Sequence, residues 1–159
     1  MEEALAFLNA HNISFERFDH PAVFTCEEAE VHCKHVPGMA CKNLFLKDKG
    51  TGRFFLVTLP ADKRMDLKVL GKHLGTNKLT FGSADELRAR LGLEPGSVSP
   101  LGLLNDHEHS VRYLVGRDVW GCADGLNIHP NQNTVSLFFS REAFRALVGA
   151  LQNPYEIYG

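Results

Sequence analysis

The chain has 159 residues, of which 44% are hydrophobic and 23% are charged, as expected of a globular protein with a core of its own. Its formal net charge of −2 argues against indiscriminate binding to nucleic acid. No apolar run approaches the roughly 20 residues that cross a bilayer, so no membrane association is expected. An acidic N-terminus, unlike that of a signal peptide, indicates a cytoplasmic protein, which we expect to be one domain over residues 1–159.

The N-terminal segment is predicted to contain a helix, a strand and a second helix. Apolar residues recur at helical spacing over residues 2–11. Residues 13–18 alternate between apolar and polar types, which is the period of a half-buried strand. Thr25 followed by Glu28 is a capping box and predicts that a short helix begins there.

A β-hairpin is predicted in the next segment. Two apolar runs, 41–46 and 54–59, flank the glycine-containing residues 48–52. Apolar runs separated by such a turn are typical of paired strands. A helix is then expected over 66–74, ended by Gly75.

The remaining elements alternate between strands and helices. Residues 79–81 are a short predicted strand, and Ser83 with Glu86 forms a capping box for a helix that ends at Gly92. The last elements are two predicted strands and a terminal helix, over 111–115, 134–139 and from Ser140 onward. Because this order lacks a strict βαβ rhythm, the fold class is α/β with a mixed sheet.

Charge is distributed unevenly along the chain. Residues 1–33 contain seven acids and one base, whereas residues 42–78 contain nine bases and three acids, a local charge of +6 (nine minus three). One interpretation is an ordinary solvated surface. The other is a docking surface for phosphates, to which binding would weaken as salt rises.

The cysteines indicate free thiols rather than disulfides or a metal site. They are Cys26, Cys33, Cys41 and Cys122. No Cys-x-x-Cys pair is present, which favours a reducing compartment. The nearest approach to a metal cluster is His32–His35 together with Cys41, but Lys34 interrupts it and the spacing is unlike that of zinc sites. We therefore expect no metal and no other cofactor, with a zinc-binding protein as an alternative.

Three separated segments carry the polar groups of a candidate site. Lys42 and Asn43 precede a predicted buried strand, where the lysine either extends to the surface or serves as a cation, and the amide is either structural or part of a site. The second segment is a rigid loop of Gly96, Ser97, Val98, Ser99 and Pro100. The third holds His129, which Pro130 forces toward an extended backbone, with Asn131 close by. Together these segments could hold a small polar ester attached to an anionic carrier.

The chain lacks the common motifs of covalent and phosphate chemistry. Gly-x-Ser-x-Gly, the Walker loop and His-Glu-x-x-His are all absent. Hydrolysis would therefore depend on positioned water or on help from the substrate. Phe24, in a predicted loop before a capped helix, is the phenylalanine that we expect near a ligand.

Several motifs, in order, resemble those of the YbaK-like aminoacyl-tRNA editing domains over roughly residues 5–150. They are His20-Pro21-Ala22-Val23-Phe24-Thr25, Lys42-Asn43-Leu44-Phe45-Leu46-Lys47-Asp48, Pro95-Gly96-Ser97-Val98-Ser99-Pro100, Leu103-Leu104-Asn105-Asp106 and Asn127-Ile128-His129-Pro130-Asn131. The chain is most similar to the free-standing branch associated with prolyl-tRNA synthetase, which deacylates alanyl-tRNA(Pro). It differs from the expected pattern at Cys41 and at Cys122-Ala123-Asp124.

The resemblance implies a fold, an activity and a set of roles. The implied fold is a mixed, partly closed β-sheet flanked by helices, and the implied reaction is hydrolysis of a wrongly charged tRNA ester. Lys42 would be the essential cation, the Gly96–Pro100 loop would shape the amino-acid pocket, and His129 would line it or carry a proton. Asn43, Asn105 and Asn131 are further implied contacts. The implied partners are mischarged tRNA(Pro), through its acceptor end, and prolyl-tRNA synthetase.

Two alternatives remain at this stage. The misacylated residue could be cysteine or serine instead of alanine. The chain could also be a module that binds tRNA or a synthetase without catalysis.

Overall fold

The computed structural model describes residues 2–22, 27, 35–131 and 134–159. The helices are α1 (Glu2–Ala10), α3 (Leu67–Leu74), α4 (Ala84–Leu91), the 3-10 helix η1 (Pro100–Asn105), α5 (Arg117–Trp120) and α6 (Arg141–Leu151). The strands are β1 (Glu16–Asp19), β2 (Met39–Asp48), β3 (Phe54–Pro60), β4 (Leu79–Phe81), β5 (Arg112–Gly116), β6 (Leu126–Ile128), β7 (Val135–Phe139) and β8 (Tyr155–Tyr158). None of these helices is long and apolar enough to cross a membrane.

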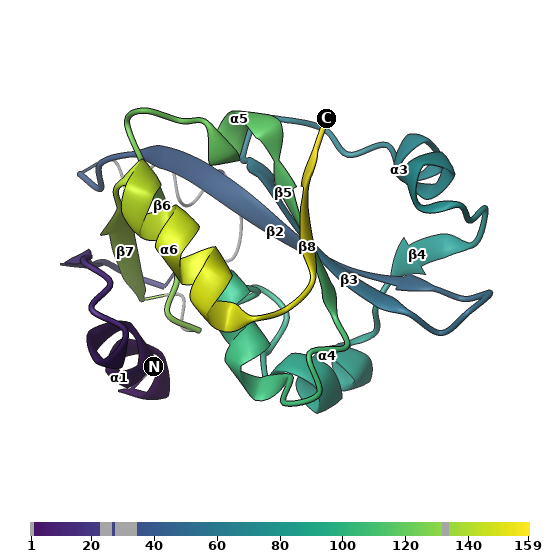
Figure 1. The fold of residues 1–159 in the computed structure, drawn as a ribbon, viewed down its shortest axis with the longest axis horizontal. Helices are drawn as coiled ribbons and strands as arrows, with labels where there is room; N and C mark the ends of the chain where they lie inside the picture. Colours follow the sequence, from purple (N-terminus) through teal and green to yellow (C-terminus); the bar gives the residue numbers. More distant parts are fainter. Residues whose placement is uncertain (1, 23–26, 28–34, 132–133) are drawn as a thin grey trace.

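All eight strands belong to one mixed sheet, as the sequence predicts. The strand order is β1-β7-β6-β2-β3-β5-β8, and β4 pairs with β2 off this path. The pairs β2–β6, β3–β5 and β5–β8 are parallel, and the other four are antiparallel. Strand β2 therefore joins the two halves of the sheet (Figure 1).

Local sequence signals place most of the elements correctly. The Asp66 carboxylate caps α3, and Gly75 ends it with φ 79°. The Ser83–Glu86 capping box begins α4, and Ser140 caps α6. The predicted hairpin is the antiparallel β2–β3 pair, although β2 begins at Met39, earlier than predicted.

The strand predicted over residues 13–18 from its apolar–polar alternation begins later and is shorter in the structure. It begins at Glu16, because Asn12 (φ 55°) ends α1 and the backbone N–H of Ile13 donates to Leu8 of that helix. Ile13 is buried in the core from this turn. The helix predicted at Thr25 lies outside the described residues.

Two apolar clusters cover opposite faces of the sheet. The larger one packs α1, α4 and α6 against one face, where Phe45, Leu56 and Leu137 belong to it. The smaller one packs α3 against the other face, where Leu46, Val57 and Leu59 belong to it. We call these the α6 face and the α3 face (Figure 1).

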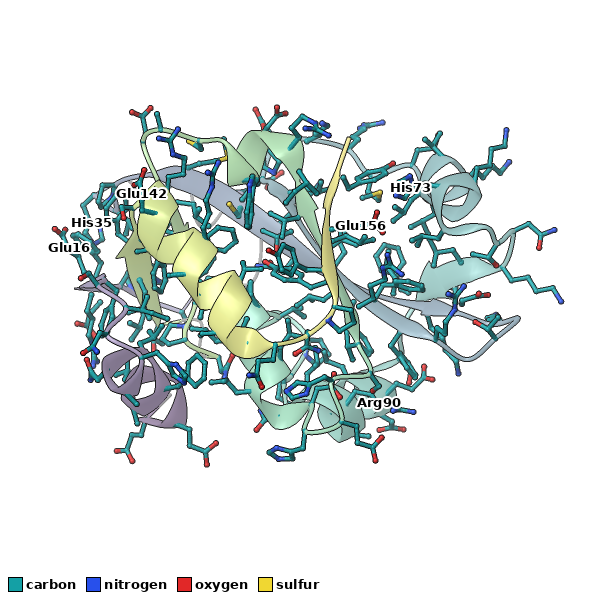
Figure 2. The ribbon with its side chains drawn as sticks, in the orientation of Figure 1. Glu16, His35, His73, Arg90, Glu142 and Glu156 are labelled. Carbon is teal, nitrogen blue, oxygen red and sulfur yellow. The ribbon has the colours of Figure 1, made fainter. Side chains whose placement is uncertain are left out.

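Helix α3 is tied to the end of the chain as well as to the sheet. His73 Nε2 of α3 lies 3.1 Å from a Glu156 carboxylate oxygen of β8. Figure 2 labels both side chains. The ring of His73 also meets Tyr158 edge to face, with centroids 5.1 Å apart. These contacts fix the position of α3 on its face.

Candidate active site

One edge of β2 changes partners in the middle of the strand. Residues 41–47 pair with β3 on one edge, whereas on the other edge β6 pairs with 39–40 and β4 with 46–48. Between β6 and β4, no strand of the described chain pairs with residues 41–44, which we call the unpaired edge. Lys42 and Asn43 both lie on it.

The two side chains point to opposite faces of the sheet, because successive residues of a strand alternate. Asn43 lies directly across from Thr58, whose hydroxyl it contacts on the α6 face. Lys42 lies across from Leu59, a member of the cluster on the α3 face. Lys42 therefore emerges on the α3 face.

The strand register also relates Lys42 to His129. In the parallel β2–β6 pair, Ala40 lies beside Asn127. This is the last pair between the two strands, so Lys42 and His129 each lie two residues beyond it along their own chain segments. Lys42 is half-buried and has no ion pair or side-chain hydrogen bond within residues 2–22, 27, 35–131 and 134–159. A half-buried cation without a counterion is suited to an anionic ligand.

The Gly96–Pro100 loop is bound directly to the His129 segment. The Ser99 hydroxyl donates to the backbone carbonyl of His129 and accepts from the N–H of Leu101 at 3.2 Å. The Asn131 amide donates to the Leu101 carbonyl at 3.4 Å. Gly96 has φ 89°, a conformation that side chains disfavour. The structure thus brings two of the three predicted segments into contact.

The His129 imidazole lies in a largely buried environment. Burial lowers the pKa of His129, and nearby His20 acts in the same direction, while a backbone group of Val135 opposes the shift. The ring is therefore neutral at pH 7. His20 is fixed between the Pro21 carbonyl and the Ser136 hydroxyl, each at 2.8 Å. Because the carbonyl only accepts, Nδ1 of His20 carries the proton and Nε2 accepts from Ser136.

Two polar atoms in this segment are buried without a hydrogen-bond partner among the described residues. They are Nδ1 of His129 and Oδ1 of Asn131. Buried polar atoms are nearly always paired, with protein groups or with water. These two atoms give the segment spare capacity to bind water or a ligand.

The lowered pKa of His129 predicts a pH-dependent stability. A histidine whose pKa is lower in the folded state binds protons more weakly than it does when unfolded. Its contribution is complete above the unfolded pKa, about 6.5, and is lost as the pH falls through the folded value. We expect urea unfolding between pH 7.5 and 5 to show a loss of stability that is smaller in His129→Gln. His107→Gln, which changes an exposed histidine, should retain the wild-type slope. Equal slopes in all three proteins would contradict the assignment.

Two residues that the sequence did not single out lie next to Asn43. The Thr58 hydroxyl donates to Asn43 Oδ1 at 2.5 Å, and the Tyr113 hydroxyl lies 2.7 Å from the same Thr58 oxygen. Thr58 on β3 contacts Asn43 directly and Tyr113 on β5 contacts Thr58, so only the strand register reveals them. Burial also raises the pKa of the adjacent Cys41 thiol to about 12, which keeps it protonated and unsuited as a nucleophile.

The other predicted residues differ in how the structure uses them. Asn105 donates to the Leu91 carbonyl at 2.7 Å and so helps to end α4. Val98 packs against the core of the α6 face, and Pro100 is buried at the start of η1. Phe24 lies outside the described residues.

The zinc alternative finds no support in the described part of the chain. No three His, Cys, Asp or Glu side chains come together there as metal ligands would. His32 and Cys33, on which that alternative depends, lie outside it, while His35 is exposed and Cys41 is half-buried.

Comparison with known protein families identifies the domain that contains these residues. Residues 20–147 match the family model of the aminoacyl-tRNA editing domain. The chain belongs to this family. The matched region contains every predicted site residue, so the unpaired edge, the Gly96–Pro100 loop and the His129 segment are all parts of the editing domain.

Relatives support the assignment over nearly the whole chain. The editing domain is 33% identical over 156 residues to the prolyl-tRNA editing protein ProX of Acetoanaerobium sticklandii, covering 98% of this chain and 94% of that one. It is 35% identical over 145 residues to prolyl-tRNA synthetase associated domain-containing protein 1 of Mus musculus, covering 90% and 86%.

Solved structures share the fold at low sequence identity. The hypothetical protein APE2540 superposes with a TM-score of 0.75 at 18% identity, covering 98% of this chain and 97% of that one. A candidate trans-editing enzyme for prolyl tRNA synthetase superposes with a TM-score of 0.73 at 18% identity, covering 98% of this chain and 94% of that one. The predicted α/β fold with a mixed sheet is thereby confirmed.

Proposed function

We propose that this editing domain hydrolyses the ester bond of mischarged alanyl-tRNA(Pro) as a free-standing, cytoplasmic enzyme. The observation that carries the proposal is Lys42, a half-buried cation without a counterion in the described chain, two residues beyond the last β2–β6 pair. His129 lies two residues beyond the same pair, and Ser99 fixes the Gly96–Pro100 loop to it. The similarity to a protein described as a prolyl-tRNA editing protein supports the choice of tRNA.

Selective hydrolysis of the alanyl ester requires a second amino-acid pocket, smaller than the synthetase pocket that accepts proline. A site that accepts proline also admits the smaller alanine, because a missing methylene costs a pocket only about 1–3 kcal/mol. A rigid wall that admits alanine and excludes proline corrects this error. The Gly96–Pro100 loop is suited to that task, since Ser99 and η1 fix its end and Gly96 sets its backbone direction.

Each polar group has a role in the proposed hydrolysis. Lys42 binds a phosphate or another oxygen atom of the tRNA terminus. The terminal ribose hydroxyl, present only in RNA, orients the attacking water. Neutral His129 lines the pocket and can accept a hydrogen bond or a proton. Because burial keeps the Cys41 thiol protonated, we assign it no role as a nucleophile, and water is the proposed attacking group.

A basic surface on the α3 face supports an RNA substrate. Five exposed basic side chains on α3, in the loops before and after it, and in the β2–β3 turn have no ion pair within the described residues: Lys49, Arg64, Lys68, Lys72 and Lys78. Two of them line a surface hollow of about 540 Å³ at the tip of the β2–β3 hairpin, next to Asp48. Because α3 covers the face on which Lys42 emerges, an acceptor stem over this face would meet these charges.

Parallel hydrolysis assays on alanyl-, cysteinyl-, seryl- and prolyl-tRNA(Pro) test the proposal. The ester lifetime of alanyl-tRNA(Pro) is expected to shorten most and that of prolyl-tRNA(Pro) to stay unchanged. Faster hydrolysis of the cysteinyl or seryl ester would replace the substrate but keep the reaction. Tight tRNA binding with every ester lifetime unchanged would instead establish a binding module.

A further inference from the structure

Three polar side chains form a buried row across adjacent strands of the α6 face. They are Asn43 on β2, Thr58 on β3 and Tyr113 on β5. Thr58 Oγ1 lies 2.5 Å from Asn43 Oδ1 and 2.7 Å from the Tyr113 hydroxyl. Thr58 is 0% exposed and Tyr113 is 1% exposed.

Counting protons fixes the direction of every bond in this row. The Tyr113 hydroxyl has no other hydrogen-bond partner in the described chain, so its proton goes to Thr58. Burial raises the pKa of Tyr113 far above its usual range, which keeps that proton in place. Thr58 has one proton of its own and donates it to Asn43, which must therefore present Oδ1 and not its NH₂ group.

The same count leaves the NH₂ group of Asn43 available. Its nitrogen has no hydrogen-bond partner among the described residues and is not one of the enclosed unpaired atoms. Asn43 is half-buried and lies on the unpaired edge next to Lys42. Reversing the amide would place a donor against Thr58 and leave one of the two buried hydroxyl protons, that of Thr58 or that of Tyr113, without an acceptor.

We propose that Thr58 and Tyr113 are positioning residues that direct the NH₂ group of Asn43 toward the substrate. Resting on the proposed function, this makes Asn43 a donor to the ester carbonyl oxygen, which gains negative charge as water attacks. A donor that is already oriented stabilises this charge without reorganisation at the moment of reaction. Tyr113 and Thr58 act only through Asn43 and touch no substrate.

Single-turnover hydrolysis at saturating enzyme tests the row. Tyr113→Phe is expected to slow the reaction about tenfold while the dissociation constant for tRNA stays unchanged. Thr58→Val should lose at least as much, and Thr58→Ser, which keeps the hydroxyl, should restore the rate. The matched control is Tyr155→Phe, the same change directly across the β5–β8 pair, which should behave as wild type. A wild-type rate in Tyr113→Phe would overturn the inference.

A mutant cycle separates positioning from a structural role. Asn43→Asp keeps an acceptor for the Thr58 proton but removes the donor, so Tyr113→Phe should cause no further loss in that background. Additive losses would overturn the inference.

The side-chain amide NMR signals of Asn43 test its orientation without any activity. They should change in Tyr113→Phe and stay unchanged in Tyr155→Phe, and unchanged signals in Tyr113→Phe would overturn the inference. A wild-type protein that hydrolyses no ester would overturn the proposed function, while these spectra still decide the orientation of the amide.

Discussion

Replacing Lys42 by alanine is expected to slow alanyl-tRNA(Pro) hydrolysis by about 100-fold or more, while the protein stays folded. Removal of one preorganised charge or donor from a reaction site costs about 100- to 1,000-fold in known enzymes. Lys42 has no ion pair with any of the residues that the structure describes, so the change leaves no counterion buried among them. Its loss should therefore affect the ligand and not the fold.

Two further variants sharpen this experiment. Lys42→Met keeps the apolar stem without the charge and should lose as much activity as Lys42→Ala. Lys72→Ala removes an exposed charge of α3 and should leave the single-turnover rate at saturating enzyme near wild type. Thermal unfolding of each variant reports on folding. A rate within twofold of wild type in folded Lys42→Ala would remove Lys42 from the reaction.

The elements that the sequence predicts well are those with local signals. Capping residues, glycine stops and a glycine-containing turn act over three or four neighbours, so α3, α4, α6 and the β2–β3 hairpin are readable directly. Strands β6 and β8 are three and four residues long and depend on pairing with distant β2 and β5. Pairing with these distant strands, and not shortness alone, explains why both were missed, since β4 is equally short and was predicted.

The candidate site shows the same difference between features that local sequence reveals and features that depend on strand pairing. Motif resemblance placed Lys42, the Gly96–Pro100 loop and His129 in one site, and the structure joins the latter two through Ser99. It could not show which face of the sheet Lys42 and Asn43 each project to, since that depends on which residues of β3 lie across from them. No local sequence signal marks Thr58 and Tyr113, because only the register of three strands connects them to Asn43.

Replacing Ser99 by alanine is expected to lower the stability of the fold and the selectivity for alanyl-tRNA(Pro) over prolyl-tRNA(Pro). The Ser99 hydroxyl is fully buried and satisfies two backbone groups, the carbonyl of His129 and the N–H of Leu101. Leaving buried groups unpaired costs about 1–3 kcal/mol of unfolding free energy. Because the loop is then no longer fixed against the His129 segment, the pocket wall loosens and prolyl-tRNA(Pro) should be hydrolysed faster relative to alanyl-tRNA(Pro).

Urea unfolding and the ratio of the two hydrolysis rates measure these effects in the same protein. Ser14→Ala, the same change at a serine outside the site, is the control, because the exposed Ser14 side chain makes no hydrogen bond with the described residues. It should leave both quantities near wild type. If Ser99→Ala lost stability but kept full discrimination against proline, the loop would be a structural connector, and the wall that excludes proline would have to lie elsewhere in the domain.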